Sequence, residues 1–281
     1  MSKFHVDCEL EYEVAAQTVF VFNIGVPDDQ RQRVVEESVE LDPSLSWDEL
    51  REPETLNRFI RVDVPPGAFR IRYLALVDVT PVEADSAAAE VPITALPVDA
   101  FACLRGSRYC ESEAIFKLAC RLFGQLAPGY SRVDAICRWI RANIDYMIGT
   151  STPSYSARDV LAHRVGVCRD FAHLAITFCR ALNIPARFVT GYARYAEPPP
   201  DFHAVFEAFL GGRWQLFDPT DLSPMRDLVR IGTGRDASEV PFATFFGAAR
   251  LRRLSALIEA ADEGAGLGRL QTPTSGILLA A

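Results

Sequence analysis

Strand-forming residues dominate the first part of the chain. Apolar and β-branched residues cluster in short runs at residues 18–24, 58–64 and 69–77. Pro65-Pro66-Gly67 separates the last two runs, which is a hairpin signal. The pattern predicts a β-sandwich-like N-terminal domain over residues 1–97, and the Ala- and Pro-containing stretch 84–97 marks its end.

Apolar residues recur at helical spacing after this boundary. Two such stripes predict core helices, and Pro128-Gly129 separates them. Ser131 is placed to cap the second helix. The stripes are Ile115, Leu118, Ala119 and Leu122, and then Val133, Ile136, Ile140 and Ile144.

A third helical stripe follows Cys168. Its members are Phe171, Leu174, Ala175, Phe178 and Leu182. Asn183 tolerates a left-handed helix end, and Pro185 cannot continue a helix. We therefore expect a helix of roughly fourteen residues, with Cys168 in its first turn.

Two strand-like runs, 202–210 and 213–218, are joined by Gly211-Gly212 and predict a tight hairpin. With a two-residue loop, His203 and Asp218 become diagonal neighbours on one face of the sheet. Their backbones then lie ~7–8 Å apart, which allows a hydrogen bond between the side chains. A three-residue loop would break this alignment.

These positions suggest a nucleophilic cysteine. The free N–H groups and positive dipole at a helix start favour a thiolate, and the backbone N–H of Cys168 could stabilise an oxyanion. Gly166 would let a substrate approach the chain closely. His203 would act as the base and Asp218 would orient it.

Several alternatives remain open at this level. Cys168 could be a buried apolar residue, as Cys120, Cys137 and Cys179 are expected to be. His203 alone could be a hydrogen-bonded core histidine. Glu207, Asp221 and Asp170 compete with Asp218 for the carboxylate role, and the Cys–His separation does not follow from spacing.

Four segments follow one another in a characteristic order: 166–174 (GVCRDFAHL), 179–192 (CRALNIPARFVTGY), 203–204 (HA) and 217–220 (FDPT). Together they resemble the core of the bacterial transglutaminase-like superfamily, which includes cysteine proteases. The resemblance spans about residues 153–222. It implies an α+β fold with a papain-like core, in which a nucleophile helix packs on an antiparallel sheet. It also implies Cys168 as nucleophile, His203 as base and Asp218 as orienting acid.

The chain departs from the family pattern at Val205, because family members often carry Trp directly after the His-Ala pair. The second oxyanion donor is not assigned. The family includes proteases, amidases, protein cross-linking enzymes and members without established activity. Hydrolysis of a peptide or isopeptide-like amide is the first expectation and protein-glutamine transamidation the second. A non-catalytic binding protein is the alternative from another class.

The composition limits the kinds of partner and the cellular location that are expected. The chain of 281 residues has a net charge of −8 and no basic run, so nucleic acid is not expected. No secretory signal and no apolar run of ~18 residues is recognised, which predicts a cytoplasmic protein without a membrane partner. Seven cysteines, an odd number, favour reduced thiols. The expected partner is a peptide or protein bearing an amide, and this chemistry needs no metal or cofactor.

The C-terminal part gives a weaker pattern. We assign residues 98–245 to the catalytic core and 246–281 to a C-terminal extension. Leu251, Leu254 and Ile258 lie at helical spacing and predict a helix over residues 250–262. Residues 264–281 are expected to form a poorly ordered tail.

Overall fold

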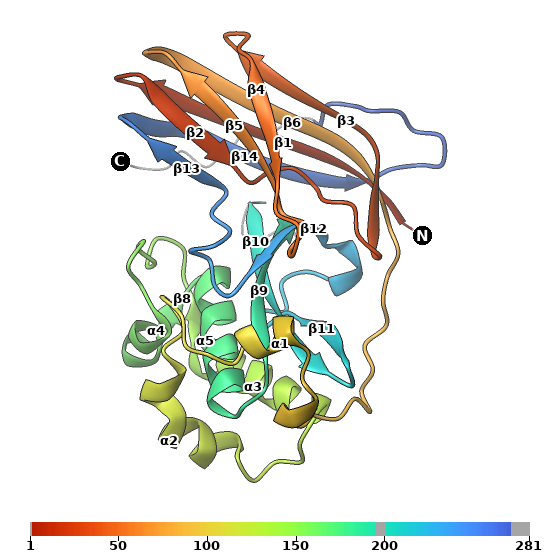
Figure 1. Cartoon of the computed structure of the whole chain (residues 1–281), viewed down its shortest axis with the longest axis vertical. Helices are drawn as coiled ribbons and strands as arrows, with labels where there is room; N and C mark the ends of the chain where they lie inside the picture. Colours follow the sequence, from red (N-terminus) through yellow and green to blue (C-terminus); the bar gives the residue numbers. More distant parts are fainter. Residues whose placement is uncertain (1, 195–200, 271–281) are drawn as a thin grey trace.

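The computed structural model describes residues 2–194 and 201–270, which fold as a sandwich of two sheets beside a mixed core (Figure 1). In the sandwich, one sheet has the strand order β14-β1-β6-β3 and the other β13-β2-β5-β4. The first sheet comprises β1 (Ser2–Val14), β3 (Gln32–Asp42), β6 (Gly67–Val79) and β14 (Ala249–Ala260). The second comprises β2 (Thr18–Phe22), β4 (Trp47–Arg51), β5 (Arg58–Val64) and β13 (Ala243–Phe246).

Alternation explains why these segments become strands. In β5, Ile60, Val62 and Val64 are buried, whereas Arg61 and Asp63 between them are exposed. Successive side chains on a strand point to opposite faces, so one face of β5 contributes to the core between the sheets. The β-sandwich expected near the N-terminus is therefore confirmed.

The helix predicted over residues 250–262 is wrong. This segment is strand β14, which pairs antiparallel with β1 from Phe4↔Ala260 to Val14↔Ala249. Leu254, Ala256 and Ile258 alternate along β14 and enter the sandwich core. Of the expected tail, residues 271–281 lie outside the described residues.

The mixed core beside the sandwich begins with two short helical elements, and four longer helices follow. These are η1 (Ile93–Ala95), α1 (Val98–Ala102), α2 (Ser112–Phe123), α3 (Tyr130–Asn143), α4 (Ala157–His163) and α5 (Cys168–Ala181). Two short strands, β7 (Asp145–Tyr146) and β8 (Val165–Gly166), pair in parallel and come before α5 in the chain. The helices α2 and α3 contain the two predicted stripes except for Ile144, which is the C-cap of α3. Gly129 rather than Ser131 is the N-cap of α3.

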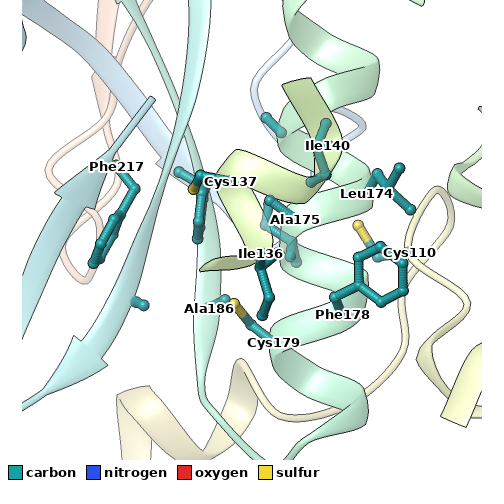
Figure 2. Packing of buried hydrophobic residues seen from close by; sticks show 14 of the residues in the cluster. Cys110, Ile136, Cys137, Ile140, Leu174, Ala175, Phe178, Cys179, Ala186 and Phe217 are labelled. Atoms are coloured by element: carbon teal, nitrogen blue, oxygen red, sulfur yellow. The ribbon is translucent and has the colours of Figure 1, made fainter. Parts of the chain in front are cut away.

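A four-stranded antiparallel sheet supports α5. Its order is β11-β10-β9-β12, formed by β9 (Ala186–Tyr192), β10 (Phe202–Leu210), β11 (Arg213–Phe217) and β12 (Val229–Gly234), with η2 (Met225–Asp227) before β12. Figure 2 shows Leu174, Ala175 and Phe178 of α5 packed among apolar residues from α3 and the sheet. Burial of this face of α5 fixes the orientation of the helix, and therefore where Cys168 lies.

The sandwich and the core are packed together. Tyr192, Val229 and Ile231, at adjoining ends of β9 and β12, are buried in the sandwich core. The Tyr192 hydroxyl donates a hydrogen bond to the carbonyl of Ile24, at 2.7 Å. Within residues 2–194 and 201–270, no helix is both long and apolar enough to cross a membrane.

Candidate active site

Cys168 is the first residue of α5 and is half-buried. Val167 before it is extended, and the Asp170 carboxylate accepts a hydrogen bond from the Val167 N–H at 2.9 Å. This carboxylate is buried and satisfies one of the N–H groups left free where the helix begins. Asp170 therefore fixes the peptide from which the nucleophile helix starts.

The other oxygen of Asp170 binds the loop before α4. It accepts a hydrogen bond from the Ser151 hydroxyl at 3.0 Å and forms an ion pair with Arg169 at 3.1 Å. The same guanidinium donates to the Thr152 carbonyl at 2.8 Å. Loop 151–152 and the start of α5 are thus held to one another around a buried carboxylate.

The hairpin that carries His203 and Asp218 has the predicted register. Leu210 pairs with Arg213, and Phe206 pairs with Phe217. Gly211 and Gly212 have φ values of 60° and 79°, and two consecutive positive φ values are the requirement of a type I′ two-residue turn. The turn therefore fixes the alignment on which the expected His–Asp contact depends.

His203 and Asp218 form a direct hydrogen bond. The distance from Nε2 to Oδ2 is 2.9 Å, and the two side chains are 0% and 4% exposed. Burial alone would lower the pKa of His203, but its hydrogen bonds with Asp218 and Cys168 raise this pKa to about 10. The protonated, positively charged imidazole is therefore the form that this site favours.

Cys168 lies close to His203. Its Sγ is 4.0 Å from the carbonyl oxygen of Phe202, the residue before His203. Nε2 faces Asp218, and the nearby Cys168 thiol is a further cause of the raised pKa of His203. The structure thus brings together the three residues singled out in the sequence.

Asp218 is fixed by the turn that follows it. Its Oδ1 accepts hydrogen bonds from the backbone N–H of Thr220 at 2.8 Å and from the Thr220 hydroxyl at 2.6 Å. Burial raises the pKa of Asp218, but the hydrogen bonds from His203 and Thr220 outweigh burial and hold this pKa below its ordinary value. Asp218 is therefore an ionised carboxylate with both oxygens engaged.

The competing carboxylates have other partners or positions. Glu207 pairs with Arg31, Arg187 and Arg230, and Asp170 caps α5. Asp221 is exposed in the turn after β11. Asp218 is consequently the carboxylate that contacts His203.

Val205, the departure from the family pattern, is fully buried. It packs with Val189, Ala193 and Leu228 in a small apolar cluster beside the sheet. The smaller side chain is accommodated within the protein here, two residues along β10 from His203.

The other thiols are poor candidates for nucleophiles. Burial raises the pKa of Cys110 to about 11 and also raises the pKa of Cys8, Cys137 and Cys179. His173, on α5, accepts a hydrogen bond from the Ala237 N–H through Nε2 and stacks on Tyr109, so its contacts are structural. In the described part of the chain, no three His, Cys, Asp or Glu residues are grouped as metal ligands would be.

Thr220 and Ser151 also support this site, and neither has a role predicted from the sequence. Thr220 lies in the recognised FDPT segment, and its position two residues after an aspartate is the signal of a side chain that can bond back to that carboxylate. Ser151 carries no comparable signal, since 19 residues separate it from Asp170.

Both parts of the chain are similar to known proteins. Residues 117–219 match the transglutaminase-like superfamily, and residues 2–99 match the N-terminal domain of bacterial transglutaminases. A solved structure from Cytophaga hutchinsonii, named a "Putative Cysteine Protease", is 37% identical. The similarity covers 98% of this chain and 96% of that one, with a TM-score of 0.88.

Two mycobacterial proteins, both named uncharacterized, are also similar. ML0607 of Mycobacterium leprae is 37% identical over 119 residues, which is 38% of this chain and 41% of that protein. Rv2569c of Mycobacterium tuberculosis is 32% identical over 146 residues, which is 46% of each. The chain thus spans less than half of the length of these curated relatives. From the site geometry and the full-length similarity to the Cytophaga structure, we conclude that the chain belongs to the transglutaminase-like superfamily.

Proposed function

We propose that the protein is a cysteine-nucleophile enzyme that cleaves an amide bond through a thioester intermediate. The observation that carries this proposal is the buried His203, which bonds Asp218 through Nε2 and whose pKa is raised by both Asp218 and the nearby Cys168. A thiol, an imidazole and a carboxylate in this order activate a nucleophile and orient its base.

The first half of the reaction forms the acyl-enzyme. The Cys168 thiolate attacks the amide carbonyl carbon, a C–S bond forms, and the carbonyl oxygen becomes an oxyanion. The backbone N–H of Cys168, at the start of α5, is available to donate to this oxyanion because the first N–H groups of a helix lack partners within it. His203 gives its proton to the leaving nitrogen, the C–N bond breaks, and an amine departs.

The second half consumes the thioester. A water molecule loses a proton to His203 as its oxygen attacks the thioester carbonyl, the C–S bond breaks, and a carboxylic acid is released. A primary amine in place of water would give a new amide instead. Hydrolysis of a peptide or isopeptide-like amide is our first choice, in keeping with the name of the Cytophaga relative.

The decisive test is the reactivity of Cys168. Site-resolved mass spectrometry would follow alkylation of each cysteine by iodoacetamide between about pH 5 and pH 10, a range around the pKa of a free thiol. Cys120 is an internal control because it is also half-buried but lies on α2, away from His203. Fast alkylation of Cys168 well below pH about 8.5, lost in His203→Ala, is the expected result.

If Cys168 reacts no faster than Cys120 and His203→Ala changes nothing, the catalytic proposal fails. A protein that uses the same fold only for binding would then be the better description.

A second experiment separates hydrolysis from transfer. The protein would be incubated with a library of peptides, with and without a fluorescent primary amine, and the products identified by mass spectrometry. Hydrolysis gives new carboxylates whether or not the amine is present, whereas transamidation gives amine-labelled peptides. Cys168→Ala is the matched control, since it removes the nucleophile and should abolish both products.

The cytoplasmic location expected from the sequence stays a prediction. All seven cysteines are free, and a reducing compartment is the environment that keeps thiols in this state.

A further inference from the structure

The hydroxyl of Thr220 has a defined direction. Its Oγ1 accepts a hydrogen bond from the Leu222 N–H at 3.3 Å and lies 2.6 Å from Oδ1 of Asp218. Asp221, between Thr220 and Leu222, has a φ of 61°. This left-handed conformation turns the chain so that the Leu222 N–H faces Thr220. Because a carboxylate can only accept, the hydroxyl proton must point to Asp218.

This hydroxyl and the Thr220 backbone N–H are the two donors to Oδ1, while Oδ2 faces His203. A carboxylate can rotate about its last side-chain bond, a torsion with broad preferences. Donors to one oxygen therefore decide where the other oxygen lies. The Asp218 side chain is 4% exposed, so water cannot easily replace a lost donor.

We propose that Thr220 is a positioning residue for the reaction, which holds Oδ2 of Asp218 on Nε2 of His203 and so keeps the imidazole oriented for Cys168. This inference rests on the proposed function for its catalytic consequence. The simpler alternative is that Thr220 only shapes the turn after β11, in which case its loss would reduce stability and leave His203 unchanged.

The test compares Thr220→Val with Thr220→Ser. Valine keeps the shape of the side chain and the backbone N–H but removes the hydroxyl, whereas serine keeps the hydroxyl. Thr177→Val is the matched control, because Thr177 is a buried threonine whose hydroxyl also makes a short hydrogen bond, at 2.6 Å to the backbone carbonyl of His173. Thr220→Ala replaces Thr220→Val if the valine variant does not fold.

The first readout is the titration of the His203 imidazole, followed by NMR of the ring nitrogens in the full chain. We expect Thr220→Val to lower the apparent pKa of His203 by about one unit, as for the loss of one charge-assisted hydrogen bond. Alkylation of Cys168 at neutral pH should slow about tenfold for the same reason. Thr220→Ser and Thr177→Val should both titrate and react as the wild type does.

Two results would overturn the inference. An unchanged His203 titration in Thr220→Val would reduce Thr220 to a turn residue. A raised pKa would show that the hydroxyl merely withdraws charge from Asp218 and does not orient it. The NMR titration decides the matter even if Cys168 proves unreactive, so failure of this inference and failure of the proposed function can be told apart.

Discussion

Arg31 donates a hydrogen bond to Glu207 at 3.0 Å and thereby joins the sandwich to the strand that carries His203. Arg187 also donates to Glu207, at 2.7 Å, and Arg230 donates to it from β12. The Glu207 side chain is 0% exposed. One buried carboxylate therefore balances guanidinium groups from both parts of the molecule.

Replacing Glu207 by Gln should destabilise the protein by about 3–5 kcal/mol. Removal of one partner from a buried ion-pair cluster leaves the remaining charges uncompensated, and such changes cost about this much. The free energy of unfolding in urea would measure the effect.

Asp134→Asn is the matched control for this experiment. Asp134 pairs with Arg138 on the surface of α3, where the side chains are 42% and 64% exposed. Its loss should change the free energy of unfolding by about 0–1 kcal/mol. Equal effects of the two variants would mean that the Glu207 cluster contributes no more than a surface pair.

The same carboxylate predicts a loss of stability in acid. Burial alone would raise the pKa of Glu207, but Arg230, Arg187 and Arg31 outweigh burial and lower this pKa to about 2. A lowered pKa adds stability that is complete above the unfolded-state value of about 4.3 and is lost as the pH falls through the folded value. The difference in unfolding free energy between wild type and Glu207→Gln should therefore shrink between about pH 4.3 and pH 2. A constant difference across this range would contradict the assignment.

His203 predicts the opposite dependence at alkaline pH. Its pKa of about 10 in the folded protein lies above the ordinary value of about 6.5. Its contribution to stability is complete below about pH 6.5 and is lost as the pH rises through about 10. Asp218→Asn removes the main cause, so the stability difference between wild type and this variant should shrink across that window. Chemical denaturation at several pH values would reveal it, and a difference that grows with pH would show the sign to be wrong.

Gly166 leaves no space for a side chain. A Cβ placed on it would lie 2.8 Å from the Cβ of Asp170, so Gly166→Ala must displace the residue that caps α5. We expect a loss of about 1–3 kcal/mol in stability and slower alkylation of Cys168. Gly266→Ala is the control, because a Cβ added at that position would have no described atom within 4 Å. Normal Cys168 reactivity in Gly166→Ala would show that this cap does not position the thiol.

The hairpin and the nucleophile helix could be predicted because their determinants are local. The Gly211-Gly212 pair specifies a two-residue turn, and the turn sets the register that aligns His203 with Asp218. The apolar stripe after Cys168 has the period of a helix, and α5 extends over Cys168–Ala181. For these elements, the nearest residues in sequence decide the structure.

β14 could not be predicted in the same way. Leu251, Leu254 and Ile258 fit a helical face, and Ala, Leu, Arg and Glu are good helix formers. Pairing with β1, at the opposite end of the sequence, overrides this weak local preference. The Arg31–Glu207 contact was missed for a related reason, because 176 residues separate its partners and neither position carries a local signal.

The pairing of β1 with β14 also determines the order in which the protein can be completed during synthesis. β1 emerges from the ribosome before β14, its neighbour in the sheet, which is made only after the core between them has been translated. Until then that edge of β1 is open, with unpaired backbone groups that can recruit other strands. This edge of β1 is thus open to mispairing while the core is made, and the arrival of β14 removes that hazard.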